Sequence, residues 1–432
     1  MKVIKKPTLK RAVNLFTLTM YGIGIILGAG IYALIGKSAG MAGNSLWISF
    51  LIASIVSIFT GLSYAELISL FPQSAAEYIY VKNSFKNKVL AFSVGWVETA
   101  ADVISASVVA IGFAGYLYTL TGVPIILGSL GIILGLSLVN FWGIGESTKI
   151  NEIFTFIEIF GLLLVIFFAI PHFGSVDYME MPNGFTGVLS AGALIFFAFI
   201  GFEDIANITE ETKDPRKTAP KALIFSMAFT TLIYMLVAIS VVSLAPWDSL
   251  ADSTAPLAYA VSGKIGQNAF LLLSIIALFA TANTVLVLLV VGARHIYGMS
   301  KDGSLPKFLS KIHPRRRTPW VSVLVVMVIA AAFVFLENIE IVASITDFAV
   351  FLVFFFVNAA AIILRFTMPE RKRAFRMPLN IGKFPIIPLI GLITIVALTI
   401  HLDPFTILIG FVLLLSAVPM YYVLRKKSRI KI

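Results

Sequence analysis

The sequence predicts an all-α integral membrane protein with twelve transmembrane helices. Of its 432 residues, 59% are hydrophobic and 13% are charged, whereas a soluble domain has about half apolar and about a quarter charged residues. Apolar stretches recur from residue 12 to residue 424 with only short interruptions. Many of them reach the roughly 20 helical residues that a bilayer crossing needs, so we expect one membrane domain over residues 1–432.

The predicted spans form two sets of five and a final pair. The first set lies within 12–171, the second within 187–366, and the pair within 385–424. Because five is odd, the second set enters the membrane from the opposite side, which predicts an inverted repeat. The twelve spans are 12–38, 44–70, 87–119, 124–142, 150–171, 187–211, 219–245, 267–299, 319–336, 340–366, 385–402 and 404–424.

The distribution of basic residues supports this span count. The net charge is +11, and twelve crossings place 31 of the 33 Lys and Arg residues on one side of the membrane. Only Lys37 and Lys264 fall on the other side. Since basic loops stay in the cytoplasm, we expect both termini to be cytoplasmic in a multi-pass protein of the cell membrane. The run "RRR" at 315–317 is then a topology signal, and no nucleic-acid partner is expected.

Several classes of chemistry are excluded by residue type. The chain has no cysteine, which excludes disulfides and thiolate metal sites. Its four histidines share no metal-ligand spacing, and no phosphate-binding loop is present to hydrolyse ATP. We therefore expect no enzyme activity, no metal, no cofactor and no obligate protein partner. The basic segment before the first span is expected to stay attached rather than to be cleaved.

The first span is rich in glycine where a membrane helix most needs its internal hydrogen bonds. Gly22, Gly24, Gly28 and Gly30 lie within it, although Gly favours a helix less than Ala by roughly 1 kcal/mol. One interpretation is close helix packing, because Gly24 and Gly28 form a small-xxx-small pair. The other is that the helix unwinds and offers bare N–H groups to a ligand.

The sixth span is irregular at the corresponding place. Gly201 is followed by Glu203 and Asp204, where an ionised carboxylate costs roughly 2.5–3.5 kcal/mol. In inverted-repeat transporters, helices broken at the midplane direct N–H groups toward anions and carbonyls toward cations. An α-amino acid carries both charges close together, so we expect its carboxylate near residues 28–30 and its amine near the carbonyls of 197–200.

Four strings in the chain resemble the amino acid-polyamine-organocation superfamily, and within it the cationic-amino-acid-transporter-like branch. They are "GAGIY", "YAELISLFP" with "AAEYIY", "GFEDIANITEETKDPRKTAPKAL" and "GARHIYGMSKDGSLP". The resemblance implies the leucine-transporter-type fold, with spans 1–5 and 6–10 as inverted repeats, helices 1 and 6 unwound at the midplane, and spans 11 and 12 peripheral. It also implies secondary active transport of amino acids by alternating access.

The resemblance carries over to particular positions. Backbone N–H groups in the first span would meet the substrate carboxylate, carbonyls in the sixth would meet the amine, and the acidic position after the sixth-span break is associated with gating or substrate contact. The chain departs from the family at two places. It has "AAEY" at 75–78, where "GGEY" is usual, and it has Ala29 where many relatives have Ser or Thr. The implied substrate-binding residues are Ile26, Ala29, Gly30, Ile31, Phe197, Ala198, Ile200 and Glu203.

Three intramembrane acids are candidates for proton coupling. Glu158 stands where several proton-coupled relatives have Lys, about eight residues or ~12 Å into its helix, and its alternative role is a structural hydrogen bond. Glu98 and Asp102 lie four residues apart on one helix face, so we expect one of them to be protonated. They could form a relay, attract a basic substrate side chain or join neighbouring helices.

The eighth span adds hydroxyl groups near its middle. Thr281 and Thr284 are candidate sodium ligands, and interhelical hydrogen bonding is the alternative. Taken together, these features predict a transporter that is embedded in membrane lipid and couples amino acid uptake to the movement of protons. An amino acid/polyamine exchanger without proton coupling and a non-transporting amino-acid sensor are the alternatives.

Overall fold

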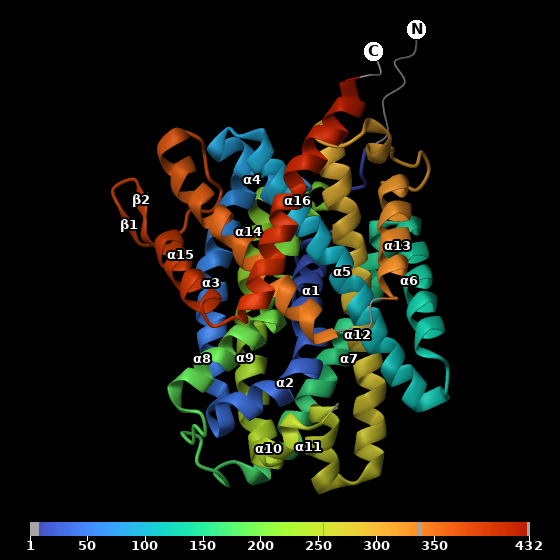
Figure 1. Ribbon diagram of the computed structural model, residues 1–432, viewed down its shortest axis with the longest axis vertical. Helices are drawn as coiled ribbons and strands as arrows, with labels where there is room; N and C mark the ends of the chain where they lie inside the picture. The colour runs from blue at the N-terminus through green and yellow to red at the C-terminus, as the bar shows by residue number, and fades with distance from the viewer. Residues whose placement is uncertain (1–7, 254, 336–338, 430–432) are drawn as a thin grey trace.

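Long apolar helices run roughly along the long axis of the molecule in the computed structural model (Figure 1). The structure describes residues 8–253, 255–335 and 339–429. Within them, 10 helical stretches are long and apolar enough to cross a membrane. Trp320–Phe333 and Ile386–Thr399 are shorter apolar helices, and they coincide with the predicted ninth and eleventh spans. Residue 336, where the ninth span was predicted to end, lies outside the described residues.

Seven α-helices lie within the described residues 8–183. Asn14 and Asn87 cap two of them by accepting hydrogen bonds from backbone N–H groups of the first turn. A 3-10 turn, Gly43–Ser45, joins α2 to α3, and Ile170–His172 follows α7. The helices are α1 (Leu15–Leu27), α2 (Ala29–Ala42), α3 (Leu46–Leu70), α4 (Ala76–Phe85), α5 (Lys88–Thr121), α6 (Ile125–Trp142) and α7 (Ile144–Ala169).

The part of the chain from residue 184 onward begins with a helix that breaks up into short 3-10 turns. These are α8 (Gly184–Ile195), η3 (Phe196–Phe199), η4 (Glu203–Ala206) and η5 (Thr209–Glu211). The elements that follow are α9 (Pro215–Leu244), α10 (Trp247–Ala251), α11 (Pro256–Ile265), α12 (Gln267–Lys301), η6 (Lys307–Ser310), α13 (Trp320–Phe333), α14 (Ile339–Thr367), the hairpin β1 (Asn380–Ile381) and β2 (Phe384–Pro385), α15 (Ile386–Thr399) and α16 (Pro404–Arg429).

Burial separates central helices from peripheral ones. The most apolar window of Gln267–Lys301 is 83% buried and that of Leu15–Tyr32 is 78% buried, against 17% for Pro404–Leu424. Large apolar side chains such as Leu127 and Leu415 are more than half exposed on the outer helices. In Figure 1, α1 lies in the interior, while α6 and α13 flank the bundle on one side and α15 on the other. The outer helices therefore present an apolar surface suited to lipid.

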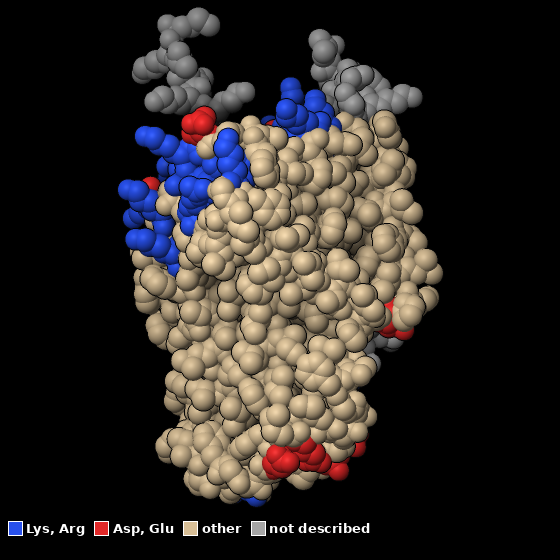
Figure 2. Space-filling view, turned by 90° about the vertical axis from the view of Figure 1, so that its left-hand side faces the viewer, with Lys and Arg blue, Asp and Glu red and all other residues tan. Residues whose placement is uncertain are grey.

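The two ends of the molecule carry different charge. On the face drawn in Figure 2, most Lys and Arg side chains gather at one end and the largest group of acidic side chains lies at the other, with a nearly uncharged surface between them. Part of the basic group lines a surface pocket that contains Arg371, Arg376 and Lys383. An uncharged band between two charged ends is the pattern of a membrane-spanning protein.

Candidate functional site

The first helix is interrupted within the glycine-rich stretch. α1 ends at Leu27, Gly28 takes φ −57° and ψ −144°, and α2 starts at Ala29. The first N–H groups of a helix have no intrahelical acceptor, and here the Ala29 N–H donates to Thr284 Oγ1 of α12 at 3.0 Å. A Cβ at Gly28 would overlap that same Thr284 oxygen, so the break requires glycine.

Gly24, one turn earlier, has a different role. A Cβ there would overlap Thr155 Oγ1 and lie 2.6 Å from Asn283 Nδ2. Asn283 Nδ2 donates to Thr155 Oγ1 at 3.2 Å, and Asn151 Nδ2 donates to Asn283 Oδ1 at 2.9 Å. Gly24 therefore lets α1 approach the polar side chains of α7 and α12. Of the two interpretations of the glycine-rich span, close helix packing applies at Gly24 and interruption of the helix applies at Gly28.

The second interruption lies between α8 and η4. The chain passes from η3 through Gly201, whose φ of +113° is a conformation that L side chains rarely adopt. The Gly201 N–H donates to Glu203 Oε2 at 2.9 Å, so Glu203 caps the break from within. The two interruptions meet directly, because a Cβ at Gly30 would lie 2.6 Å from Ala198 Cα.

Tyr234 of α9 joins the two interruptions. Its hydroxyl donates to Ala198 O at 2.8 Å and also lies against Ile26 O, in the last turn of α1. The side chain is fully buried. The last carbonyls of a helix lack intrahelical donors, so the Tyr234 hydroxyl is placed to donate to a carbonyl on either side of the site. Because it has a single proton, it donates to one of the two carbonyls at a time.

We expect Tyr234→Phe to loosen this connection. Removing the hydroxyl leaves buried carbonyls without a donor, which costs about 1–3 kcal/mol and should weaken ligand affinity at the adjoining cavity about fivefold or more. Ligand binding to the purified protein measures the effect. Tyr259→Phe is the matched control because that ring is 41% exposed. Unchanged affinity in Tyr234→Phe would show that the hydroxyl does not shape the site.

A small cavity of about 30 Å³ lies between the two interruptions. It has room for one or two water molecules, so a larger ligand requires surrounding side chains to move. Asp102 and Ser105 of α5 line it, and Ser105 Oγ lies 3.0 Å from Thr346 Oγ1 of α14. The lining residues are Ile25, Ile26, Ala29, Gly30, Ala101, Asp102, Ser105, Val109, Phe197, Ile200, Gly201, Thr284, Leu288, Thr346 and Val350.

The structure brings most of the predicted binding residues to this cavity. Ile26, Ala29, Gly30, Phe197 and Ile200 line it. Three others lie nearby without lining it: the Ala198 carbonyl accepts from Tyr234, Glu203 caps Gly201, and Ile31 lies in the first turn of α2.

Glu158 is fully buried on α7, with the Asn283 side chain of α12 near its carboxylate. Neither carboxylate oxygen makes a well-aligned hydrogen bond among the described residues. Tyr32 of α2 lies near Glu158. Its Oη would be 3.2 Å from a Cβ built at Gly161, which follows Glu158 by one turn of α7. The Tyr32 hydroxyl is also without a partner in the described structure. An ionised carboxylate here would lack a counter-charge, which is costly in an apolar interior.

The hydroxyls considered for sodium are engaged within the chain. Thr281 Oγ1 donates to Ala277 O at 2.8 Å, on its own helix. Thr284 Oγ1 donates to Ala280 O at 3.2 Å and accepts from the Ala29 N–H. Both hydroxyls thus have the hydrogen bonds of a packed membrane helix.

A cluster of buried acids lies beside the cavity. Carboxylate oxygens of Glu98, Asp102 and Asp204 lie within 4.8 Å of one another. All three side chains are buried, and each has an oxygen without a hydrogen-bond partner in the described structure. Like charges at that spacing repel, so the three acids must share protons or a cation. Asp204 was not among the predicted site residues.

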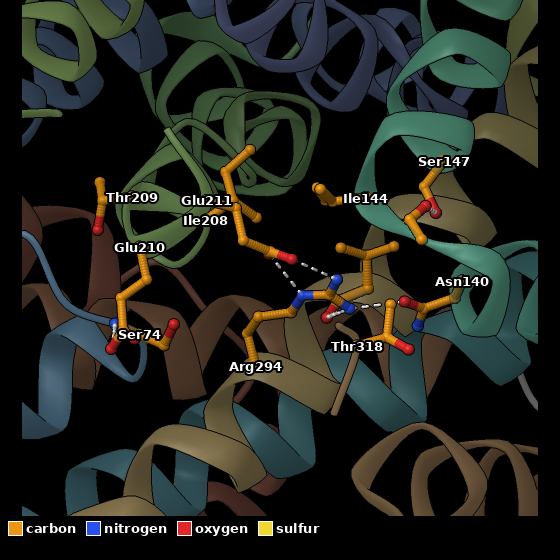
Figure 3. Close-up of polar contacts among 12 residues, drawn as sticks. Ser74, Asn140, Ile144, Ser147, Ile208, Thr209, Glu210, Glu211, Arg294 and Thr318 are labelled. Carbon is orange, nitrogen blue, oxygen red and sulfur yellow. Dashed lines mark hydrogen bonds and ion pairs between the residues drawn. The ribbon is translucent and has the colours of Figure 1, made fainter. Parts of the chain in front are cut away.

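Buried ion pairing fixes the chain after the second interruption (Figure 3). Arg294 of α12 is fully buried and donates through Nε and Nη2 to Glu211 at 3.0 and 3.2 Å. Its Nη1 donates to Asn140 Oδ1 at 2.6 Å. The Glu211 carbonyl accepts from the N–H groups of Ala12 and Val13, just before α1. The segment after the first interruption is therefore bonded to α12 through Ala29. The segment after the second is bonded through Glu211 to α12 and to the residues just before α1.

Comparison with known proteins gives a consistent picture. The family model for amino acid permeases matches residues 13–424. The chain is 31% identical to the branched-chain amino acid permease BcaP of Bacillus subtilis over 98% of this chain and 94% of that protein. It is 30% identical to the methylthioribose transporter of the same organism, over 90% and 87% of the two chains. Mouse cationic amino acid transporter 4 is 29% identical over 84% of this chain and 61% of its own.

Proposed function

Because the chain belongs to the amino acid permease family, a family of transport proteins rather than enzymes, we propose that it carries amino acids across a membrane by alternating access. The observation that supports this most is the meeting of two interrupted helices at one small cavity. Broken helices leave backbone donors and acceptors for a ligand with opposite charges. A cavity of this small size fits a carrier whose two ends open in turn.

The substrate carboxylate would bind at the start of α2, and the amine would bind at η3. Gly30 and Ile31 lie in the first turn of α2, where N–H groups lack helical acceptors. The Ala29 N–H would exchange Thr284 Oγ1 for the carboxylate. On the other side, the carbonyls of Phe197, Ala198 and Ile200 would accept the amine. Asp102 in the cavity wall favours a cation close by.

The proposed architecture has twelve crossings, with 12–171 and 187–366 as inverted five-helix repeats and 385–424 as peripheral helices. Both repeats would then begin with the interrupted helix. The basic end of the molecule would face the cytoplasm, together with both termini (Figures 1 and 2). At this end Arg294, with Glu211, would keep the inner gate closed until substrate arrives.

Proton-coupled uptake is the proposed energy source, and amino acid/polyamine exchange without protons is the alternative. Glu158 supports coupling because it is buried beside the interrupted helix without a counter-charge. Binding and releasing one proton there would change the charge next to α1 during the cycle.

Glu158→Gln is expected to abolish accumulation driven by an imposed pH gradient while keeping exchange of internal for external substrate. Gln preserves size and polarity but cannot lose a proton. Uptake by proteoliposomes with an acidic exterior measures the first activity, and counterflow measures the second. Glu152→Gln on the same helix, partly exposed, is the control. A Glu158→Gln protein that still acidifies the liposome interior during uptake would remove Glu158 as a coupling residue.

Counterflow tests the proposed function and its substrate together. Proteoliposomes preloaded with one unlabelled compound should concentrate the labelled form of a substrate, whatever the energy source. The relatives' names suggest the panel: branched-chain amino acids, cationic amino acids and methylthioribose. Accumulation of an amino acid establishes a carrier. Ligand-induced thermal stabilisation without any counterflow would favour an amino-acid sensor instead.

A further inference from the structure

His295 lies between two buried carboxylates that belong to different helices. Its Nδ1 is 3.2 Å from Asp102 Oδ2 of α5, and its Nε2 is 3.4 Å from Glu77 Oε2 of α4. All three side chains are buried, with His295 only 1% exposed. Asn207 Nδ2 donates to Glu77 Oε2 at 3.2 Å, which orients that carboxylate. Histidine can accept a proton on one nitrogen and release one from the other.

The surroundings of His295 contain far more acid than base. Glu98 lies on α5 and Glu203 and Asp204 on η4, and both Glu98 and Glu203 interact electrostatically with Glu77. Buried tyrosines face the cluster from α1, α3 and α4: Tyr21, Tyr64 and Tyr80. Arg294, the neighbouring cation, is engaged by Glu211. Five buried carboxylates with one imidazole among them cannot all be charged, so the cluster holds exchangeable protons.

The line from Asp102 to Glu77 runs from one cavity toward a second. Asp102 is in the wall of the cavity between the interrupted helices. A second cavity, of about 190 Å³, is lined by Ser74 and Ile79, on either side of Glu77 in sequence, and by Gly298. Gly298 follows His295 by about one turn of α12. His295 is therefore placed between the candidate substrate cavity and a cavity at the basic end of the molecule.

We propose that His295 is a proton relay between Asp102 and Glu77. The proposal rests on the proposed transport function and adds to it the route by which the coupled proton leaves the substrate cavity. Protonated Asp102 gives its proton to Nδ1, and the ring releases the proton on Nε2 to Glu77. Asp102 becomes a carboxylate, Glu77 a neutral acid, and the ring keeps its charge. Glu77 then loses the proton to the second cavity. The first tautomer returns when Nδ1 releases its proton to water and Nε2 takes one up from water, which leaves the charge of the ring unchanged.

The transfer needs a small realignment, because neither ring nitrogen makes a well-aligned hydrogen bond within the described structure. Proton-transfer contacts are often long in a resting state and shorten once the substrate is bound. Substrate in the cavity would contact Asp102 and bring the relay into line. Proton movement would thereby depend on substrate, as coupling requires.

His295→Gln tests the relay in proteoliposomes. We expect accumulation driven by a pH gradient to fall roughly 100-fold, the size of a lost proton-transfer group, while counterflow continues. Glu77→Gln should give the same pattern, because it removes the proton acceptor. His401→Gln, beyond the end of α15, is the control and should match the wild type. Proton-driven accumulation that survives in His295→Gln overturns the relay and leaves the transport function standing.

Two further outcomes separate the relay from the function it serves. Wild-type counterflow without proton-driven accumulation, or accumulation driven by sodium instead, overturns both the proton coupling and the relay but not the carrier. If His295→Gln does not fold, the relay is tested by NMR in a variant that keeps His295 and has Gln in place of the other histidines, His172, His313 and His401. Ring-nitrogen NMR of labelled His295 should then change on adding substrate, and an unchanged signal refutes the relay.

Discussion

Replacing Arg294 with methionine is expected to lower the free energy of unfolding by roughly 3–5 kcal/mol. The change leaves Glu211 as a buried charge without its partner, because both Arg294 nitrogens that reach this carboxylate are lost. It also removes the donor to Asn140. Thermal and chemical unfolding of the purified protein measure the loss, and transport should fall with it.

Lys301 is the matched control on the same helix. It pairs with Glu210, the neighbour of Glu211, at 2.7 Å, but its side chain is 52% exposed. Exposed ion pairs contribute about 0–1 kcal/mol, so Lys301→Met should leave stability nearly unchanged. Equal losses in the two variants would contradict the claim that burial makes the Arg294 pair critical.

The double variant Arg294→Met/Glu211→Leu separates stability from gating. Replacing both members of a buried pair by apolar groups is often neutral or stabilising. We therefore expect stability to recover in the double variant while transport stays impaired, because the pair that we propose closes the basic end is gone. Full recovery of transport would show that the pair serves stability alone.

Gly30→Val is expected to reduce substrate binding by at least about 100-fold. A side chain at Gly30 would meet the Ala198 backbone, since a Cβ would lie 2.6 Å from Ala198 Cα. The two interrupted helices would be forced apart where their polar groups face the ligand. Substrate-induced thermal stabilisation and counterflow measure the effect. The valine side chain would fill the space proposed for the carboxylate and would also displace η3.

Gly131→Val controls for the change from glycine to valine in a helix. Gly131 lies within α6, and a Cβ there meets nothing within 4 Å. Because valine favours a helix slightly more than glycine, stability should change by about 0.5 kcal/mol or less. Gly30→Ala should be intermediate between Gly30→Val and wild type. Normal uptake by Gly30→Val would remove the proposed site.

The membrane-protein class and the positions of most helices could be predicted from hydropathy and charge. Both interrupted helices were also predictable, because glycines and adjacent acids are costly in an apolar helix without a compensating role. The predicted fifth span begins at 150, whereas α7 begins at Ile144. Its first turn is polar and lies outside the apolar stretch, so hydropathy did not include it.

Contacts between distant helices could not be predicted from one sequence. Tyr234 stands in an ordinary apolar helix, and nothing in its neighbourhood indicates that it joins two interruptions 208 and 36 residues away. His295 was set aside because the histidines share no ligand spacing. Its partners, Glu77 and Asp102, come from two other helices. In the sequence, the one signal for His295 is that it and Arg294 stand side by side near the end of a predicted span.

The central claim is that main-chain groups at two helix interruptions hold the two charged ends of an amino acid. Competition against counterflow of a transported amino acid tests it most directly, using the unlabelled amino acid, its methyl ester and its N-acetyl derivative. We expect the free amino acid to compete and the two blocked derivatives, each lacking one charge, to fail. Competition by the methyl ester or the N-acetyl derivative as strong as that of the free amino acid would contradict the account.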